Sequence, residues 1–301
     1  MNVAKNNHQE PLVFYGRKQM GLIRRDLSNW LENTSISKSR YNKIGNVLIL
    51  SCFSSIILYV FILTFWQPNQ TFKVIYQLIL FLLILIPVGS LIGFIFSKTK
   101  ANTYKKISKH EYRTQVSEKI IELLNRDIDE ESIIDLKVSY KSHKDASHKL
   151  STTNHPRKAG WKIYNYRNEW LSVRGTFVDK TNFYLTVAEL SKTAYGTKRS
   201  RSGKIKSKSK DKNLGLELSL ICRYPQKRYG AIQVLKDELI KALKVPADCQ
   251  TKKIKLTNKS LIWVVRLSPH LSTNPEKIYQ AIIMMFLSLY QILNLAKKLT
   301  K

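Results

Sequence analysis

Two long apolar runs near the N-terminus dominate the hydrophobic pattern of the chain. Residues 44–66 and 74–97 contain no charged side chain, and the segment QPNQTFK separates them. A helix rises about 1.5 Å per residue, so about 20 apolar residues cross the hydrocarbon core of a bilayer. Pro68 interrupts any helix between the two runs. The pattern therefore predicts a transmembrane hairpin over residues 44–97.

Lysine and arginine are distributed unevenly around this hairpin. Eight of them precede residue 44, one lies between the two runs, and six fall within residues 98–113. Segments rich in lysine and arginine stay on the cytoplasmic side of a membrane. We therefore expect both termini in the cytoplasm, with residues 1–43 as a basic cytoplasmic tail. Within this tail, an amphipathic pattern from Met20 to Leu31 predicts a helix that either lies on the inner leaflet or packs against the protein's own domain.

The chain after the hairpin alternates between helical and β-type patterns. Residues 98–158 are expected to form a juxtamembrane helix, over 98–126, and then a polar linker, over 139–158. Residues 159–301 carry aromatic and β-branched runs separated by turn residues, which predict antiparallel strands. The expected strands cover 161–167, 169–178, 182–190, 214–223, 252–256 and 261–267, with an amphipathic helix over 229–244. The predicted fold class is therefore α+β, a transmembrane hairpin followed by a cytoplasmic antiparallel sheet covered by helices.

The last apolar run, residues 278–296, is a candidate for a third membrane segment. It lacks charge, but a helix that starts at Pro275 after an Asn274 N-cap brings polar residues into one stripe. A polar stripe that faces lipid is costly, so we expect this helix to pack over the sheet with the stripe in water. A third span remains the alternative. The stripe comprises Glu276, Lys277, Gln280, Ser288, Gln291, Asn294 and Lys298.

Charge distinguishes the soluble part from the membrane part. The 301 residues include 51 Lys and Arg against 21 Asp and Glu, a formal net charge of +30, and none of these residues lies in the two apolar runs. A field of this sign favours anionic partners such as lipid headgroups, nucleic acid or acidic proteins. Cys52, Cys222 and Cys249 show no CxxC spacing and are odd in number, which disfavours a disulfide framework or a zinc site.

The most concentrated basic segment is residues 192–212, KTAYGTKRSRSGKIKSKSKDK. It joins two patterned strands and cannot add to a core, so we expect a long basic loop. Such a loop attracts anionic lipid or the phosphates of nucleic acid, and a solvated loop without a partner is the alternative. The candidate anion-binding residues are Lys198, Arg199, Arg201, Lys204, Lys206, Lys208 and Lys210.

Catalytic patterns are sparse in this sequence. The chain has no GxGxxG, HExxH or GxSxG motif. Asp179, Glu189 and Lys192 loosely resemble the carboxylate pair and lysine of restriction-type nucleases, but the spacing from Glu189 to Lys192 is one residue too long. We interpret these three residues as surface charges and predict no catalytic residue.

Metal and stacking sites are also weakly indicated. Three histidines near Asp145 follow no recognised ligand spacing, so we expect solvated side chains and neither a metal nor another cofactor. These histidines are His143, His148 and His155. An aromatic strand fits packing within the sheet, with base stacking as the alternative. Its aromatic residues are Trp161, Tyr164, Tyr166 and Trp170.

Three short motifs stand out beside these patterns: RGTFVD (174–179), KRSRSGKIKSK (198–208) and RYPQKRYG (223–230). Through them the chain resembles uncharacterised two-span membrane proteins of cyanobacteria. The resemblance implies a bacterial inner membrane or a thylakoid membrane, and it transfers no catalytic residue.

These observations predict a membrane-anchored, non-enzymatic module whose basic cytoplasmic domain engages anionic lipid headgroups or an acidic partner. One alternative is a membrane-tethered nucleic-acid-binding protein or nuclease. Another is a structural subunit of a larger membrane complex.

Overall fold

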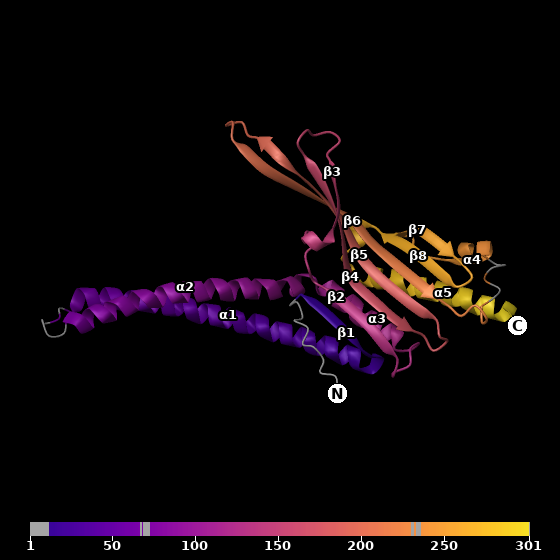
Figure 1. Cartoon of the computed structure of the whole chain (residues 1–301), viewed down its shortest axis with the longest axis horizontal. Coiled ribbons are helices and arrows are strands. Elements are labelled where there is room, and N and C mark those ends of the chain that lie inside the picture. Colours follow the sequence, from indigo (N-terminus) through magenta and orange to yellow (C-terminus); the bar gives the residue numbers. More distant parts are fainter. Residues whose placement is uncertain (1–11, 67, 69–72, 230–231, 233–235, 301) are drawn as a thin grey trace. The chain divides into compact units, whose positions relative to one another are not determined.

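The computed structural model describes residues 12–66, 68, 73–229, 232 and 236–300 and has an α+β architecture (Figure 1). The helices are α1 (Met20–Phe65), α2 (Lys73–Lys109), α3 (Glu111–Leu124), α4 (Lys236–Ala242) and α5 (Pro275–Thr300). The strands are β1 (Val13–Gln19), β2 (Ile133–Ser139), β3 (Lys149–Asn154), β4 (Lys162–Thr176), β5 (Asn182–Arg199), β6 (Ile205–Arg223), β7 (Cys249–Leu256) and β8 (Ser260–Leu267).

Internal contacts divide the chain into two units. One unit is Asn29–Lys109, and the other combines the residues up to Ser28 with His110–Lys301. The second unit is discontinuous because β1 precedes the long helices in sequence but pairs with β2, which follows them.

The unit Asn29–Lys109 contains most of α1 and the whole of α2, which form a helical hairpin. The two helices approach closely at Gly93, where an added Cβ atom would lie 2.9 Å from Leu48 Cδ1. Ser51 and Ser90 share a hydrogen bond of 2.9 Å between the helices. Small residues at such points let apolar helices pack in lipid, where the hydrophobic effect between helices is absent.

Both helices are long and apolar enough to cross a membrane. The most apolar 18-residue window of each is only 11% buried inside the protein. α1 has 46 residues and α2 has 37, whereas about 20 residues span the hydrocarbon core. Each helix therefore extends beyond its apolar run. In these additional turns Tyr41 stacks on Tyr104, with ring centroids 6.0 Å apart.

The other unit contains one antiparallel sheet. Its strand order is β1-β2-β4-β5-β6-β8-β7, and β3 pairs with β4 off this path. The predicted alternation along the strand 214–223 is confirmed from Leu216 onward, since four alternate side chains of β6 are fully buried. These side chains are Leu216, Leu218, Leu220 and Cys222. Side chains of successive residues point to opposite faces of a sheet, so this face is apolar and the other, which we call the polar face, carries the intervening residues.

The tail expected over residues 1–43 contains a strand, β1, which was not predicted from the sequence. In β1, Phe14 lies opposite Val138 of β2 and is buried. The amphipathic segment that follows is the beginning of α1, and Met20, Ile23 and Leu27 are each at most 1% exposed. This segment therefore packs against the protein's own domain, and these three side chains are not available to the inner leaflet.

Helix α5 begins as predicted and contacts the sheet. The Lys277 N–H group donates to the side-chain oxygen of Asn274, the N-cap, at 3.2 Å. Phe286 packs edge-on against Phe183 of β5, with ring centroids 5.9 Å apart. α5 is also long and apolar enough to cross a membrane, but half of its most apolar window is buried inside the protein.

One member of the polar stripe expected on α5 is not in water. Ser288 is only 4% exposed, and its hydroxyl donates to the backbone carbonyl of Lys244 at 3.1 Å. A buried hydroxyl needs such a partner because it has left water. The stripe residues Gln280, Gln291 and Asn294 are exposed.

Several other boundaries differ from those predicted. The helix expected over 98–126 is broken at His110 into α2 and α3, and the strand β2 was not predicted. The linker expected over 139–158 contains a short 3-10 turn, Ala146–His148, and the strand β3. The strand β3 was not predicted because its composition is polar. It is exposed along its length and is held by pairing with β4.

The strands expected over 161–167 and 169–178 form one continuous strand, β4. A bulge between Glu169 and Leu171 interrupts its register with β5, and Trp170 at the bulge is fully buried. The strands expected over 252–256 and 261–267 are present as the hairpin of β7 with β8, and a turn at Asp179–Thr181 connects β4 to β5. Of the helix expected over 229–244, α4 is the described helical part, and residues 230, 231 and 233–235, with Leu235 among them, lie outside the described residues.

Candidate functional site: a lysine face on an extended β-wing

The basic segment 192–212 is not a loop, which corrects the sequence prediction. β5 and β6 continue through it as paired strands as far as Arg199 and Ile205. A tight turn closes the hairpin, where Gly203 has a φ of +77°. β3 and the beginning of β4 pair alongside. We call this projecting part of the sheet, residues 149–154, 162–166, 191–199 and 205–213, the wing (Figure 1).

The wing forms although it buries little apolar surface. Its strands continue the backbone hydrogen-bond ladder of the buried parts of β5 and β6, so each added pair extends an existing sheet. Thr193, Tyr195 and Thr197 are β-branched or aromatic and favour extended backbone. Hydrophobic patterning did not predict these strands because most of their side chains are polar and exposed.

The register of β5 with β6 places six lysines on one face of the wing. Lys192 lies opposite Lys212, and Lys198 lies opposite Lys206. Because alternate residues share a face, the serines of KSKSK point to the other side. We call this surface the lysine face, and its members are Lys192, Lys198, Lys206, Lys208, Lys210 and Lys212.

The lysine face has no internal charge compensation. Among the described residues, no carboxylate oxygen lies within 4.0 Å of any of its six ammonium groups. Like charges directly opposite each other destabilise a pair of strands. An anion bound across the lysine face would relieve this repulsion.

The only acidic residue of the segment lies on the opposite face of the wing. Asp211 accepts a hydrogen bond from the Thr193 hydroxyl at 2.7 Å, and its other oxygen lies 2.6 Å from Lys144 Nζ. The hydrogen bond from Lys144, followed by that from Thr193, lowers the pKa of Asp211 below its ordinary value. Asp211 therefore bonds to Thr193 and Lys144 on the opposite face of the wing and does not neutralise the lysine face.

One aromatic side chain covers part of the lysine face. Trp161 packs on Gly196, where an added Cβ atom would lie 2.4 Å from the indole Cγ. The indole N–H donates to the Thr197 carbonyl at 3.2 Å. Lys158 Nζ lies 4.3 Å from the centroid of the Trp161 ring. Gly196 is thus required by close contact, and Lys158 adds a further positive charge beside the face.

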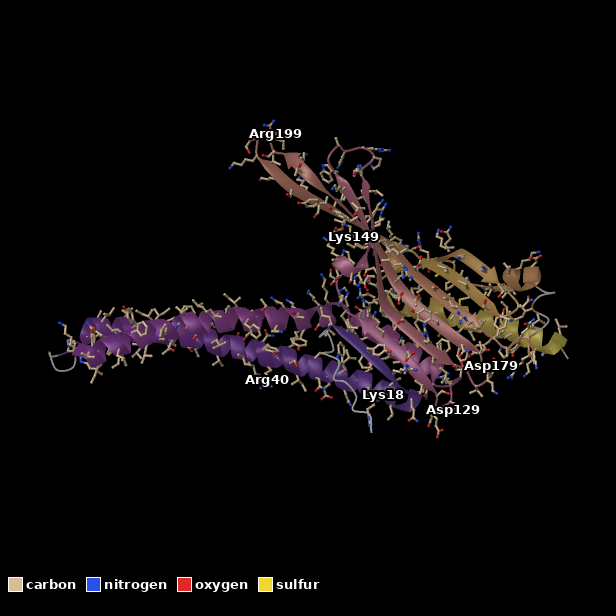
Figure 2. All side chains as sticks on the ribbon, viewed as in Figure 1. Lys18, Arg40, Asp129, Lys149, Asp179 and Arg199 are labelled. Atoms are coloured by element: carbon tan, nitrogen blue, oxygen red, sulfur yellow. The ribbon has the colours of Figure 1, made fainter. Side chains whose placement is uncertain are left out.

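The structure distributes the predicted anion-binding residues over three places. Lys198, Lys206, Lys208 and Lys210 lie on the lysine face. Arg199 pairs with Ile205 on the other face at the free end of the wing (Figure 2), and its side chain donates to the Gly203 carbonyl at 3.3 Å. Arg201 and Lys204 belong to the connecting turn.

Two lysines of this face were missing from the predicted set. Lys192 and Lys212 join it only through the pairing of β5 with β6. The strict alternation of lysine from 206 to 212 is the signal that indicates a strand with one basic face.

The aromatic residues of β4, together with Trp161 just before it, do not form one stacking surface. Trp170 is fully buried, and Trp161 lies on the lysine face. Tyr164 pairs with Thr193 on the opposite face, where Lys149 Nζ lies 4.1 Å from its ring centroid. A run of stacked bases therefore has no continuous aromatic platform here.

Asp179, Glu189 and Lys192, which loosely resemble a nuclease site in the sequence, do not come together in the structure. Asp179 lies in the β4–β5 turn, at the end of the sheet opposite to the wing (Figure 2). Glu189 is an odd number of residues from Lys192 on β5, so their side chains point to opposite faces. Glu189 instead pairs with the buried Arg113 at 2.9 Å. No shared Mg²⁺ position arises from this arrangement.

Other reactive groups are dispersed or held neutral. Among the residues that the structure describes, no group of three His, Cys, Asp or Glu side chains is close enough to hold a metal ion. Burial raises the pKa of Cys249 to about 11, and that of Cys222 also lies above its ordinary value because of burial. Neutral thiols are poor nucleophiles.

No protein-family profile, curated protein or solved structure matches the chain.

Proposed function

We propose that this protein is a membrane-anchored, non-enzymatic module that engages anionic lipid headgroups through its lysine face. The single observation that supports the proposal is the alignment of six lysines, without a carboxylate partner among the described residues, on one face of paired strands. Lysine ammonium groups act as compact point charges and lack the planar fork of arginine. This chemistry suits a fluid layer of headgroups better than one shaped anion.

The sequence supports the placement of this surface beside an inner leaflet. The lysine and arginine residues that flank the two apolar runs favour a cytoplasmic location for both termini. α3 and α5 would then cover the apolar face of the cytoplasmic sheet and leave the polar face accessible. The inner leaflet carries a negative surface potential, and each lysine near it adds about 1 kcal/mol of attraction, less than additively.

Vesicle binding by the full chain tests the proposal. The protein is inserted into phosphatidylcholine nanodiscs and mixed with vesicles of phosphatidylcholine alone or with phosphatidylglycerol, at low and at raised salt. We expect capture by the phosphatidylglycerol vesicles only, with a steep loss as salt rises. Equal capture by both vesicle types would exclude the proposal.

A matched pair of triple variants assigns the binding to the lysine face. One replaces Lys206, Lys208 and Lys210 by Gln, and the control replaces three exposed lysines of β7 by Gln. The control residues are Lys252, Lys253 and Lys255. Both variants lose the same net charge. We expect the first to weaken vesicle capture much more than the second, and equal losses would show that only overall charge matters.

Nucleic acid is the second candidate ligand. The lysines at positions 206, 208, 210 and 212 repeat at about 6.6–6.8 Å along β6, as expected for alternate residues of a strand, and Trp161 lies beside them. Phosphate contacts of this kind give affinity that falls linearly with the logarithm of salt. A salt-sensitive gel shift with RNA or DNA, together with no vesicle capture, would replace the lipid proposal.

A structural role in a larger membrane complex rests on the exposed apolar surface of α1 and α2. Purification from native membranes in mild detergent would show co-purifying subunits in that case. A lone monomer would argue against it.

A further inference from the structure

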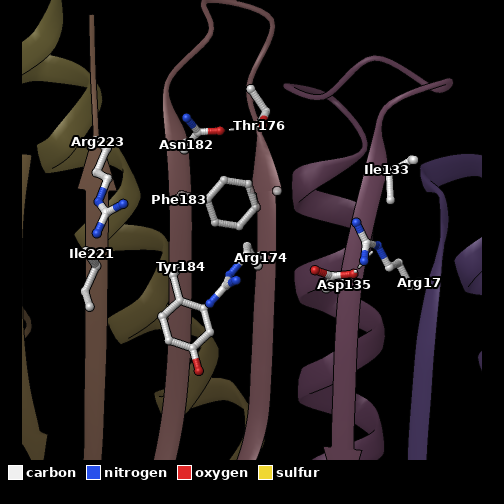
Figure 3. Close-up of a pocket in the computed structure, with 11 residues that line it drawn as sticks. Arg17, Ile133, Asp135, Arg174, Thr176, Asn182, Phe183, Tyr184, Ile221 and Arg223 are labelled. Carbon is white, nitrogen blue, oxygen red and sulfur yellow. Dashed lines mark hydrogen bonds and ion pairs between the residues drawn. The ribbon is translucent and has the colours of Figure 1, made fainter.

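A groove lies on the polar face of the sheet, at the end away from the wing. It has a volume of about 430 Å³ and crosses β1, β2, β4, β5 and β6 (Figure 3). Its polar lining consists of Arg17, Asp135, Arg174, Thr176, Asn182, Tyr184 and Arg223. Small-molecule sites typically have volumes of about 300–1,000 Å³, so the groove is large enough for a small organic ligand.

The strand register brings these side chains together. Arg17 lies opposite Asp135, Asp135 lies opposite Arg174, and Arg174 lies opposite Tyr184. One row further along β5, Asn182 lies opposite Arg223. Three arginines that are far apart in the sequence therefore converge on one groove from β1, β4 and β6.

The charges of the groove do not balance. Arg17 Nε lies 3.3 Å from Asp135 Oδ1, so these two charges offset each other. Arg174 instead lies over the ring of Tyr184, at 4.9 Å from its centroid. Among the described residues, no carboxylate oxygen lies within 4.0 Å of the side chain of Arg174 or Arg223.

The middle of the same face shows a different arrangement. Arg167 contacts Glu169 and Glu217, each at 3.1 Å. Glu217 also lies 3.9 Å from Arg266. Arginines on this face are therefore paired in the middle of the sheet, whereas Arg174 and Arg223 at the groove are left available for an anion.

Hydrogen bonds hold two further polar side chains of the groove, Asn182 and Tyr184, in place. The Thr176 hydroxyl donates to the side-chain carbonyl oxygen of Asn182 at 2.7 Å, which leaves the Asn182 amide N–H groups to donate elsewhere. The Tyr184 hydroxyl donates to Glu169 at 3.3 Å, which fixes the ring beneath Arg174. Two guanidinium forks and an amide around one space match an oxyanion that accepts several hydrogen bonds at once.

We propose that this groove is a binding site for a phosphate group, held by Arg174 and Arg223 with the amide of Asn182. Ile133 and Ile221 also line the groove and would contact the carbon part of a phosphate ester. The phosphate can belong to a soluble ester or to a lipid headgroup. This site is separate from the lysine face, and its arginines bind one shaped anion where the lysines contact a diffuse layer.

Ligand titrations of the full chain in mild detergent test the site. Inorganic phosphate and glycerol phosphate represent the soluble source, and dihexanoyl-phosphatidylglycerol below its micelle concentration represents the lipid source. Phosphorus NMR line broadening and the shift in melting temperature report binding, with chloride at equal ionic strength as the reference. Saturable binding of either source supports the site and identifies the source. Absence of saturable binding by all three overturns the proposal.

Variants assign the binding to the groove. A hydrogen bond to a charged group contributes about 1.5–3 kcal/mol, so Arg174→Gln or Arg223→Gln should weaken affinity about tenfold to hundredfold. Arg223→Lys keeps the charge but loses the fork and should give an intermediate affinity. The exposed Arg126, placed after α3, provides the matched control Arg126→Gln, which should bind normally.

The lysine-face triple variant separates this proposal from the proposed function. We expect it to bind phosphate as the native chain does while it loses vesicle capture. If the triple variant loses phosphate binding and the groove variants keep it, the phosphate site lies on the wing and the groove proposal is refuted. Unchanged melting temperatures without ligand show that all variants are folded.

Discussion

Replacement of Glu189 by Gln tests the internal support of the sheet. Arg113 of α3 is fully buried, and its guanidinium lies 2.9 Å from Glu189 Oε2 on β5. A second nitrogen donates to the carbonyl of Ser139 at 2.8 Å. The guanidinium also lies over Trp170, at 5.5 Å from the ring centroid. Glu189→Gln keeps the shape of this arrangement and leaves the buried cation without its counter-charge.

The size of the effect follows from the burial of the pair. Two unit charges about 4 Å apart attract by about 4 kcal/mol at an effective dielectric constant near 20. Removal of one partner from a buried ion pair costs about 3–5 kcal/mol. The Glu189 side chain is 17% exposed, so we expect the lower end, about 3 kcal/mol. For a unit of this size that corresponds to a fall in melting temperature of about 6–12 °C.

Thermal unfolding of the full chain in mild detergent measures this effect. Glu276→Gln is the matched control because Glu276 contacts Lys119 at the surface, where its side chain is 69% exposed. Exposed pairs contribute about 0–1 kcal/mol, so the control should shift the melting temperature little. Equal shifts in the two variants would refute the reasoning. Arg113→Met in the Glu189→Gln background should recover part of the loss, because it removes the uncompensated charge.

Three further predictions concern the wing. Gly196→Ala places a methyl group 2.4 Å from the ring of Trp161. The resulting overpacking should destabilise the protein by about 1–3 kcal/mol and shift the indole fluorescence. An unchanged emission spectrum would contradict the contact. The lowered pKa of Asp211, caused by its hydrogen bonds from Lys144 and Thr193, means that its contribution to stability is present above the ordinary carboxyl pKa and is lost as the pH falls through the lower folded value. Asp211→Asn should therefore lower the melting temperature at pH 6, and the difference from the native chain should shrink as the pH falls below the ordinary carboxyl pKa; a constant difference would contradict this. Raised salt should abolish vesicle capture while the chain stays folded, and salt-independent capture would show that the contact is apolar.

The sequence alone determined the parts of the molecule that depend on the hydrophobic pattern. Two uncharged runs of sufficient length predict membrane-spanning helices because hydrocarbon accepts only segments that satisfy their own backbone hydrogen bonds. The apolar alternation of β6 and the Asn274 cap of α5 are local signals of the same kind, and the structure confirms both.

Only the tertiary structure decided the features that depend on pairing between distant segments. β1 has one large buried residue, Phe14, and is defined by its contact with β2, which lies beyond the helical hairpin in the sequence. The wing has no apolar pattern, and its strands exist because they extend a ladder that begins in the core. The lysine face and the arginine groove both arise from register, which places side chains from separate strands beside each other. The excess of positive charge follows from composition. Strand pairing alone determined where that charge is concentrated and which arginines lack a carboxylate partner. The reason is that a hydrogen-bonded ladder fixes which residues of two strands face each other.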